Sequence, residues 1–351
     1  MTFAKNYCNI LLCVFAFQTF AGADDLYRIV VAPVAAENPR NSEAAIVPLN
    51  DGALLLAWTE FYAGDGADHG PARIAGLLSK DGGATWDGKY TLVENDGGRN
   101  VMEVNFLRLK DGRLALFYCQ KNTESTDCRV MMRASDDEGR TWGSLKQISP
   151  DNEYTGLTNG RSLRLKSGRI LLEAWHNGDS YCYLSDDDGE TWRESQRVKP
   201  GDGSWEPVCI ELKDGRVLML MRTQLGGQYE SYSSDGGETW SEPAATMLLG
   251  SAAPASLSRV PTTGDILVVW NHNPGASMRN PLTAAISSDE GKTWTNFKNL
   301  EDAAGDAWAY PAITWRPLAA TQTCSRRMVL QHESVSKQPT TGKYDERSSR
   351  A

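Results

Sequence analysis

Glutamate and arginine side chains occur at positions that repeat relative to glycine, and these residue types could bind an anion or pair with each other. One set lies nine residues before Gly52, Gly112, Gly168, Gly215 and Gly264 and consists of Glu43, Glu103, Asn159, Glu206 and Ala255. Arg222 lies seven residues after Gly215, and a planar guanidinium can hold a carboxylate through two parallel hydrogen bonds. Polar residues on otherwise apolar strands favour a functional site; the alternative is solvated strand ends.

An eight-residue pattern, Ser-x-Asp-x-Gly-x-Thr-Trp, occurs five times and sets the spacing of these positions. The copies end at tryptophans 56, 50, 48 and 54 residues apart, namely Trp86, Trp142, Trp192, Trp240 and Trp294. In each copy Ser and Asp can bond local backbone groups, Gly supplies an unusual dihedral angle, Thr can bond across the hairpin and Trp can pack between sheets. We therefore expect these copies to stabilise turns and not to touch a ligand.

Pairs of apolar strands joined by a Gly-containing turn precede the eight-residue copies, as in residues 107–116 and 211–220. Asp-Gly between alternating apolar runs is a strong hairpin signal. Four antiparallel strands in about 50 residues form one propeller blade, and the chain after residue 23 has room for roughly six. We predict an all-β, six-bladed β-propeller with four-stranded antiparallel blades. Residues 310–315 begin the last blade, and residues 26–31 are expected to close it.

The charge balance excludes two classes of partner. The chain has 36 Lys and Arg against 45 Asp and Glu, a net charge of −9. Binding to nucleic acid or to an anionic membrane surface needs clustered positive charge. No run after the N-terminus approaches the roughly 20 apolar residues of a membrane span. Neither a nucleic-acid partner nor a membrane span is therefore expected.

Residues 1–23 have the pattern of a secretory signal, with Lys5 before an apolar stretch and the small residues Ala21, Gly22 and Ala23 at its end. The alternative is a short buried helix. The signal predicts a secreted or periplasmic protein with its propeller in residues 24–336. The polar residues 337–351 are expected to form a disordered tail.

Cysteine does not define this fold, because the five cysteines after the signal show no metal-ligand spacing. We expect neither a metal nor a cofactor. Cys119 and Cys128 flank a polar loop, and an oxidising compartment would permit a disulfide between them.

The segment from Trp205 to Arg222 resembles the Glu-Pro-x-x-x-Glu-Leu-x-Asp-Gly run, ending in Arg, of the sialidase (neuraminidase) superfamily. The eight-residue copies resemble the Asp-boxes of the same superfamily. The resemblance implies that Glu206 polarises a nucleophilic Tyr and that Arg222 binds the substrate carboxylate. A structural ion pair between Glu206 and Arg222 is the alternative.

Three further segments resemble catalytic parts of that superfamily. Residues 271–283 are similar to the segment with a second carboxylate-binding arginine, which implies this role for Arg279, and Tyr310 before Pro311 resembles the nucleophile. A neutral Tyr avoids the repulsion that a carboxylate nucleophile would meet at the carboxylated carbon of a sialic acid. The resemblance also implies an acid/base Asp on a first-blade loop, for which Asp68 is the candidate and Asp65 the competitor.

The sequence departs from the superfamily at the third arginine. The Phe/Tyr-Arg-Ile-Pro tetrapeptide has no clean copy, so Arg40 is the candidate from its position on the first strand. Glu43 and Glu103 add carboxylates that must pair with an arginine such as Arg40 or Arg161, or else repel carboxylated sugars. His69, His176 and Arg161 could also line this altered site.

The resemblance implies a retaining exo-glycosidase that removes terminal sialic acid, or a related acidic sugar, from a glycan. Two alternatives remain. One is a hydrolase or lyase of the same fold that acts on another glycan, and the other is a glycan-binding propeller without turnover. Asp-boxes do not separate these functions, since propellers without enzymatic activity also contain them.

Overall fold

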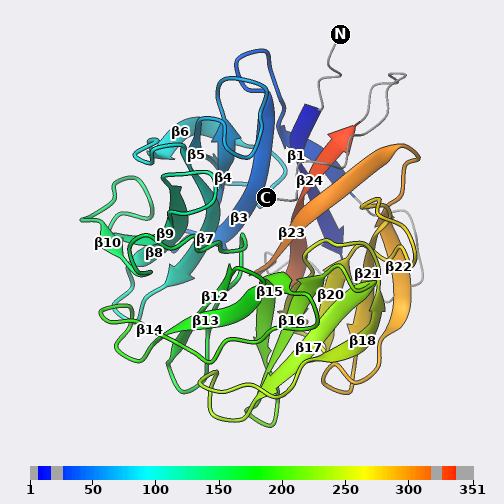
Figure 1. Ribbon diagram of the computed structural model, residues 1–351. Coiled ribbons are helices and arrows are strands. Elements are labelled where there is room, and N and C mark those ends of the chain that lie inside the picture. Colours follow the sequence, from blue (N-terminus) through cyan, green and yellow to red (C-terminus); the bar gives the residue numbers. More distant parts are fainter. Residues whose placement is uncertain (1–6, 17–26, 318–325, 337–351) are drawn as a thin grey trace.

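The computed structural model describes residues 7–16, 27–317 and 326–336, and every regular element among them is a β-strand. Figure 1 shows these strands in sheets arranged around a common centre. Within the described residues we find no helix with the length and apolarity needed to cross a bilayer. The fold is an all-β propeller of four-stranded antiparallel blades, as the hairpin and Asp-box spacing predicts.

Four of the sheets have four strands each, paired with their sequence neighbours. The second blade consists of β7 (Asn100–Arg108), β8 (Leu114–Lys121), β9 (Cys128–Ser135) and β10 (Lys146–Gln147). The third consists of β11 (Ser162–Arg164), β12 (Ile170–His176), β13 (Asp179–Ser185) and β14 (Arg193–Glu194). The fourth consists of β15 (Ser204–Glu211), β16 (Val217–Thr223), β17 (Gly227–Ser233) and β18 (Ala244–Leu249). The fifth consists of β19 (Ser256–Arg259), β20 (Ile266–Trp270), β21 (Leu282–Ser287) and β22 (Thr295–Glu301).

The remaining sheet has eight strands and corrects the prediction of six separate blades. Its first-blade strands are β3 (Arg40–Pro48), β4 (Leu54–Phe61), β5 (Ala72–Ser79) and β6 (Asp87–Val93). Its terminal strands are β1 (Tyr7–Ala16), β2 (Tyr27–Ala32), β23 (Asp306–Pro317) and β24 (Arg326–Ser336). Because β1 pairs with both β24 and β3, the terminal strands join the first blade, and the described residues form five sheets.

Both ends of the chain differ from the sequence expectation in detail. Part of the predicted signal forms β1, and the strand expected to close the last blade, β2, pairs with β1 and not with β24. Removal of residues 1–23 stays a prediction. The predicted tail, residues 337–351, lies outside the described residues.

The first strands of the blades line the centre. Contacts join β3 with β7, β7 with β11, β15 with β19, β19 with β23 and β23 with β3. The hydrophobic clusters lie mainly between neighbouring sheets, as with Leu55 of the first blade and Leu116 of the second. A side chain at the start of a first strand is therefore held near the axis by apolar packing behind it.

Asp-boxes form the turns between the third and fourth strands. In the second copy Asp137 accepts hydrogen bonds from the backbone nitrogen of Thr141 at 2.8 Å, the Thr141 hydroxyl at 2.6 Å and the Ser135 hydroxyl at 2.8 Å. The threonine thus bonds inside the turn, and the expectation of a bond across the hairpin was wrong. Trp192 packs on Phe117 of the preceding blade with ring centroids 5.8 Å apart, which confirms packing between sheets.

Replacing the box aspartate should cost stability in a pH-dependent way. Hydrogen bonds from Thr141 and Ser135 lower the pKa of Asp137 to about 2, so its stabilising effect is present above about pH 4 and is lost as the pH falls towards 2. We expect Asp137→Ala to lower the free energy of unfolding by about 1–2 kcal/mol at pH 7. Chemical denaturation at pH 7 and pH 3 measures the difference. Asp136→Ala, in the same turn, is the control, and an equal loss in both variants at pH 7 would contradict the prediction.

The Cys119–Cys128 disulfide is not formed. Both thiols are free and buried. Cys119 lies opposite Val130 and Cys128 opposite Lys121, so the two cysteines are offset by two residues along the paired strands β8 and β9.

Candidate active site

A β-bulge places side chains of the predicted polar ring at the centre of the propeller. The register shifts between Ser42 and Ala45, Met102 and Asn105, Trp205 and Val208, and Ala309 and Ala312. The bulged residues have positive φ angles of 53°, 64°, 44° and 53°, and they are Glu43, Glu103, Glu206 and Tyr310. This conformation costs a non-glycine residue about 1–3 kcal/mol and is concentrated at functional sites. The repeated strain supports a shared role at the mouth.

Tyr310 and Arg222 meet at the Glu206 carboxylate. The Tyr310 hydroxyl donates a hydrogen bond to Glu206 Oε1 at 3.1 Å, and Arg222 Nη1 donates to Oε2. Strand pairing sets Arg222 directly opposite Trp205, beside Glu206. Burial disfavours the charged Arg222, but Glu206 and Tyr310 raise its pKa above the ordinary value. Glu206 and Arg222 therefore form an ion pair, and Glu206 also accepts a hydrogen bond from the candidate nucleophile Tyr310.

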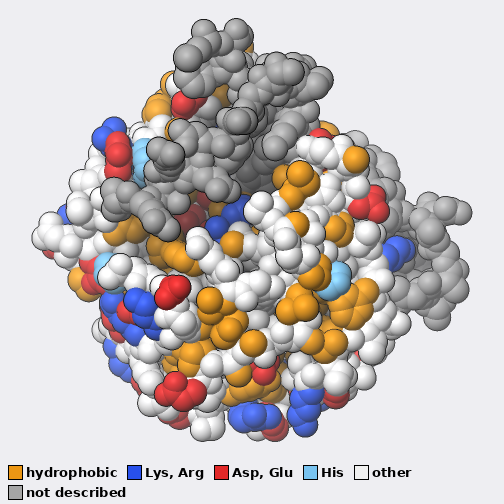
Figure 2. All heavy atoms as spheres, turned by 45° about the vertical axis from the view of Figure 1, so that its right-hand side comes forward, with side chains coloured by type: hydrophobic (Ala, Val, Ile, Leu, Met, Phe, Trp, Pro, Cys, Tyr) orange, Lys and Arg blue, Asp and Glu red, His pale blue; other side chains and the backbone are white. Residues whose placement is uncertain are grey.

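Arg279 lies against the same phenol from the loop between β20 and β21. Its guanidinium carbon is 5.4 Å from the Tyr310 ring centroid, and Nη2 donates to the Ala252 carbonyl at 3.4 Å. No ion pair joins Arg279 to a carboxylate of the described residues. Figure 2 shows Lys and Arg side chains recessed near the middle of the visible face. Arg279 is thus a cation available to an anionic ligand.

The Tyr310 phenol is neutral in the free protein. Burial and the Glu206 carboxylate raise its pKa well above the ordinary value, although Arg279 and Arg222 act in the opposite direction. A neutral phenol attacks poorly unless a base accepts its proton. Glu206 is already at hydrogen-bond distance for this.

Arg40 and Asp68 form an ion pair at the edge of the site. Arg40 Nη1 donates to Asp68 Oδ1, while Nη2 lies 3.9 Å from Glu43 Oε1. Partial desolvation by the surrounding loop tends to raise the pKa of Asp68, but the charge and hydrogen bond of Arg40 outweigh it and lower that pKa. The side chain of Asp68 is 65% exposed. The competitor Asp65 instead accepts from the Ala67 backbone nitrogen at 3.0 Å within the loop.

Arg161 is buried and bonds to backbone carbonyls near the axis. It donates to the Ala255 carbonyl at 2.9 and 2.6 Å and to the Asn159 carbonyl at 3.0 Å, and burial lowers its pKa to about 10. The Asn159 amide donates to the Ala44 carbonyl at 2.6 Å and to the Tyr310 carbonyl at 3.2 Å. These side chains fix backbone around the axis, and a role of Arg161 in lining the binding site stays a prediction.

Comparison with known proteins gives the family of this chain. A family model described as a BNR repeat-like domain matches residues 52–317. This chain belongs to the BNR repeat-like family. A sialidase of Clostridium perfringens is 30% identical to it over 224 residues, which cover 55% of this chain and 58% of the relative. A sialidase of Micromonospora viridifaciens is 25% identical over 373 aligned positions, covering 88% of this chain and 56% of the relative.

A solved structure shows the same fold. The intramolecular trans-sialidase from Ruminococcus gnavus, in complex with oseltamivir carboxylate, superposes with a TM-score of 0.68 at 15% identity, covering 86% of this chain and 95% of that chain. At this identity the likeness shows the fold alone. The BNR repeat-like chain spans between half and two thirds of the length of the two sialidases it matches in sequence.

Two residues that sequence reasoning missed hold the Asp68 loop of this BNR repeat-like propeller. Asn100 Nδ2 donates to the carbonyls of Asp68 at 3.0 Å and Gly70 at 2.8 Å, and the buried Lys121 Nζ donates to the Asp68 carbonyl at 3.2 Å. His69 lies on this loop, where partial desolvation and then the charge of Lys121 lower its pKa. The sequence feature that could have pointed to this contact is Lys121, a lysine at the end of the mostly apolar strand β8.

Glu103 makes the BNR repeat-like propeller sensitive to pH. Its Oε2 accepts from the Leu157 backbone nitrogen at 2.6 Å and from Cys119 Sγ at 3.0 Å, but burial dominates and raises its pKa to about 7. The folded state keeps this proton up to about pH 7, whereas an unfolded Glu releases it near its ordinary pKa of about 4.3. Glu103 therefore lowers stability as the pH rises between these values.

Glu103→Gln should remove this effect. From pH 4.5 to pH 7.5 the unfolding free energy of the wild type should fall, relative to that of the variant, by on the order of 2–3 kcal/mol. Denaturant titrations at both pH values measure it, with the exposed Glu242→Gln as control. A difference that is the same at both pH values would contradict the assignment.

Proposed function

We propose that this chain is a retaining exo-glycosidase that releases terminal sialic acid, or a related acidic sugar, from a glycan. The observation that carries the proposal is the hydrogen bond from Tyr310 to Glu206, with Arg222 and Arg279 beside the same phenol. Its relatives named as sialidases support this reaction class. The N-terminal signal pattern supports export, so the substrate would be an extracellular or periplasmic glycan.

The first step forms a bond from the Tyr310 oxygen to the anomeric carbon. Glu206 accepts the phenolic proton as the phenol attacks, and the glycosidic carbon–oxygen bond breaks. The neutral nucleophile approaches a carbon that bears a carboxylate without charge repulsion. Arg222 and Arg279 offer planar forks for the substrate carboxylate, and Arg222 also stabilises the negative charge that develops on the phenol oxygen.

Asp68 is assigned as the acid/base that protonates the leaving oxygen. In the free protein its pKa is lowered by Arg40, which is the wrong direction for a proton donor. A substrate carboxylate that binds Arg40 would compete with Asp68 for the guanidinium and let the pKa of Asp68 rise. Exchange of partners at Arg40 therefore couples substrate binding to formation of the acid.

The second step returns the enzyme to its starting state. Water attacks the anomeric carbon from the side that the leaving group vacated, and Asp68 accepts its proton. The bond from carbon to the Tyr310 oxygen breaks, and Glu206 returns the proton to the phenolate. Two displacements at one carbon give net retention of configuration.

A panel of fluorogenic aryl glycosides tests the proposal. We expect the wild-type protein to release the fluorophore from the α-sialoside and to leave neutral hexosides uncleaved, because Arg279 and Arg40 select a carboxylate. Uronides in the same panel separate a sialidase from an enzyme for another acidic sugar. Cleavage of neutral hexosides alone would refute the proposal.

A glycan-binding propeller without turnover is the second candidate. It is favoured by one observation, namely that Arg40 already contacts two carboxylates, Asp68 and Glu43. If Arg40 keeps these contacts when a ligand binds, the carboxylate of Asp68 stays ionised and cannot donate a proton. Glycan-array binding by the wild type with no detectable cleavage, unchanged in Glu206→Gln, would support this candidate.

A further inference from the structure

Two buried thiols meet between the third and fourth blades, and the reaction proposed above leaves them unused. Cys182 lies on β13 and Cys209 on β15, and their Sγ atoms are 3.8 Å apart. Both belong to the hydrophobic cluster between these blades, together with Leu184 and Met219. Both are free thiols in this structure. The two cysteines are 27 positions apart in the chain, so a bond between them would join neighbouring blades.

Glu173 holds the two cysteines beside each other. On the paired strands β12 and β13 it lies directly opposite Cys182, and its Oε1 accepts a hydrogen bond from the Cys209 backbone nitrogen at 3.1 Å. One buried carboxyl group thus connects the third blade to the strand of the fourth that carries the second thiol. Rotation about the Cα–Cβ bonds is the motion that brings the sulfurs from contact to a bond of about 2.05 Å.

The surroundings keep the thiols protonated and supply a base. Burial raises the pKa of both thiols, and the charge of Glu173 acts in the same direction. Burial also raises the pKa of Glu173 to about 8, which makes it a stronger base than an ordinary carboxylate. Glu173 Oε2 is buried and has no hydrogen-bond partner in the part of the chain that the structure describes. This oxygen is therefore available to accept a proton.

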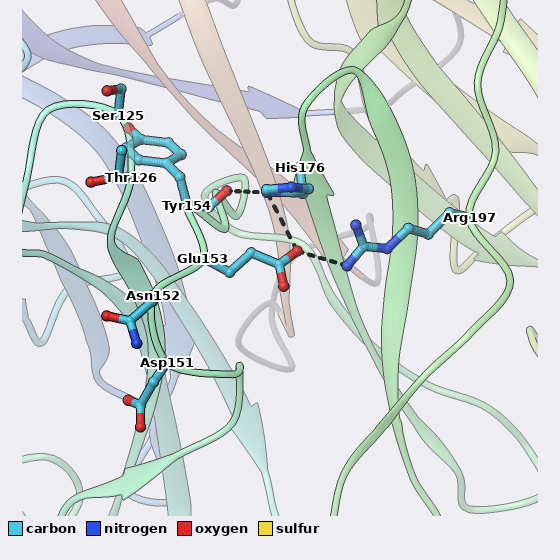
Figure 3. Close-up of a pocket in the computed structure, with 8 residues that line it drawn as sticks. All are labelled: Ser125, Thr126, Asp151, Asn152, Glu153, Tyr154, His176 and Arg197. Carbon is cyan, nitrogen blue, oxygen red and sulfur yellow. Dashed lines mark hydrogen bonds and ion pairs between the residues drawn. The ribbon is translucent and has the colours of Figure 1, made fainter.

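A cavity of about 520 Å³ borders the third blade on its other face. Figure 3 shows it beside Tyr154, with His176 and Arg197 in its wall. Arg197 lies over the ring of Tyr181 at 4.6 Å. Tyr181 precedes Cys182 on β13, and successive side chains of a strand point to opposite faces of the sheet. The cavity therefore does not open onto the thiols.

We infer that Cys182 and Cys209 are oxidised to a disulfide that links the third blade to the fourth when the chain folds in an oxidising compartment. The oxidant is another disulfide, of a small molecule or of a thiol oxidase. The Cys209 sulfur attacks it, its sulfur–sulfur bond breaks, and the first thiol leaves with the proton that Cys209 gives up. As the blades dock, Cys182 gives its proton to Glu173 and attacks the Cys209 sulfur, and the second thiol leaves with that proton. The protein loses two electrons and two protons, and the oxidant gains them.

Burial confines this reaction to folding. In the closed propeller both cysteine side chains are buried, so neither an oxidant nor a reductant reaches the sulfurs. The finished bridge therefore resists reduction, and it holds β15 three residues after Glu206. The export predicted from residues 1–23 would bring the chain to an oxidising compartment. The inference does not depend on the proposed hydrolysis.

Production in two compartments tests the bridge. The full chain is exported to a bacterial periplasm or kept in the reducing cytosol, free thiols are alkylated in denaturant, and peptides are mapped by mass spectrometry without reduction. We expect a linked Cys182–Cys209 peptide pair from the periplasm only. Cys119 and Cys128, the matched buried pair, should be alkylated in both, since Cys119 donates to Glu103 Oε2 at 3.0 Å. Alkylation of Cys182 and Cys209 in the periplasmic protein, or a bond from either to another cysteine, overturns the inference.

The melting temperature gives a second measure of the bridge. Because a disulfide restricts the unfolded chain, the periplasmic protein should melt at least about 5 °C above the cytosolic protein. Cys182→Ala should abolish this difference, whereas Cys119→Ala should keep it. If both variants keep the difference, it comes from another bond and the inference fails.

Glu173→Gln tests the proton acceptor, because an amide cannot take the proton from Cys182. Reduced, denatured protein is diluted into oxidised glutathione, and acid-quenched samples are analysed by intact mass spectrometry. The form with one glutathione attached should persist at least about tenfold longer in Glu173→Gln than in the wild type. The exposed Glu242→Gln is the control and should match the wild type. Equal lifetimes in all three proteins overturn the role of Glu173, and the peptide map decides the bridge by itself.

Discussion

Tyr310→Phe is expected to lower kcat on a fluorogenic sialoside by at least about 10³-fold while the protein stays folded. The substitution removes one oxygen, and that oxygen both donates to Glu206 at 3.1 Å and would attack the anomeric carbon. Arg279 can still lie against a phenyl ring at this position. Substrate affinity should therefore change less than turnover. Initial rates over a range of substrate concentrations separate kcat from KM.

A second Tyr–Glu pair, in the same fourth blade as Glu206, provides the matched control. Tyr232 donates to Glu230 Oε2 at 3.2 Å on β17, away from the mouth. Tyr232→Phe removes the same chemical group and should leave kcat within about twofold of wild type. Equal activity in the two variants would rule out Tyr310 as the nucleophile.

Arg279→Ala is expected to lower kcat/KM for a carboxylated substrate by about 30- to 1,000-fold, which corresponds to about 2–4 kcal/mol. Arg279 has no carboxylate partner among the described residues, so its loss removes a contact with the ligand and leaves no described anion unpaired. Arg279→Lys keeps the charge and loses the planar fork, so it should recover part of the activity. The measurement is kcat/KM on the aryl sialoside.

Arg216 offers the control for this arginine, because it lies over the Tyr232 ring at 5.2 Å as Arg279 lies over Tyr310 at 5.4 Å. Arg216→Ala should change kcat/KM by less than about twofold. If Arg279→Ala lowers the melting temperature but leaves kcat/KM unchanged, Arg279 is a packing residue and does not bind the carboxylate.

The blade pattern could be predicted from the sequence because its signals are local. Each Asp-box closes its own turn, as Asp137 does with Thr141. The pairing of the terminal strands could not be predicted, since β1 and β24 pair across almost the whole length of the chain and carry no turn signal. Their junction with β3 is what reduces the count of separate sheets to five.

The candidate site was predictable where it follows the repeat. Glu43, Glu103 and Glu206 share one offset because the same bulge recurs in their strands. Arg161 lies outside the repeated set, and its hydrogen bonds to three backbone carbonyls depend on how the blades pack. The cavity near Tyr154 comes from three loops and the end of β12, which share no motif, so spacing gave no sign of it.

Trapping a covalent intermediate tests the central claim most directly. The protein is incubated with a fluorinated analogue of the terminal sugar whose intermediate hydrolyses slowly, and its peptides are then analysed by mass spectrometry. We predict one added sugar on the peptide that contains Tyr310 and none in Tyr310→Phe. A sugar attached to any other residue, or hydrolysis of the sialoside with inverted configuration, would contradict nucleophilic attack by Tyr310.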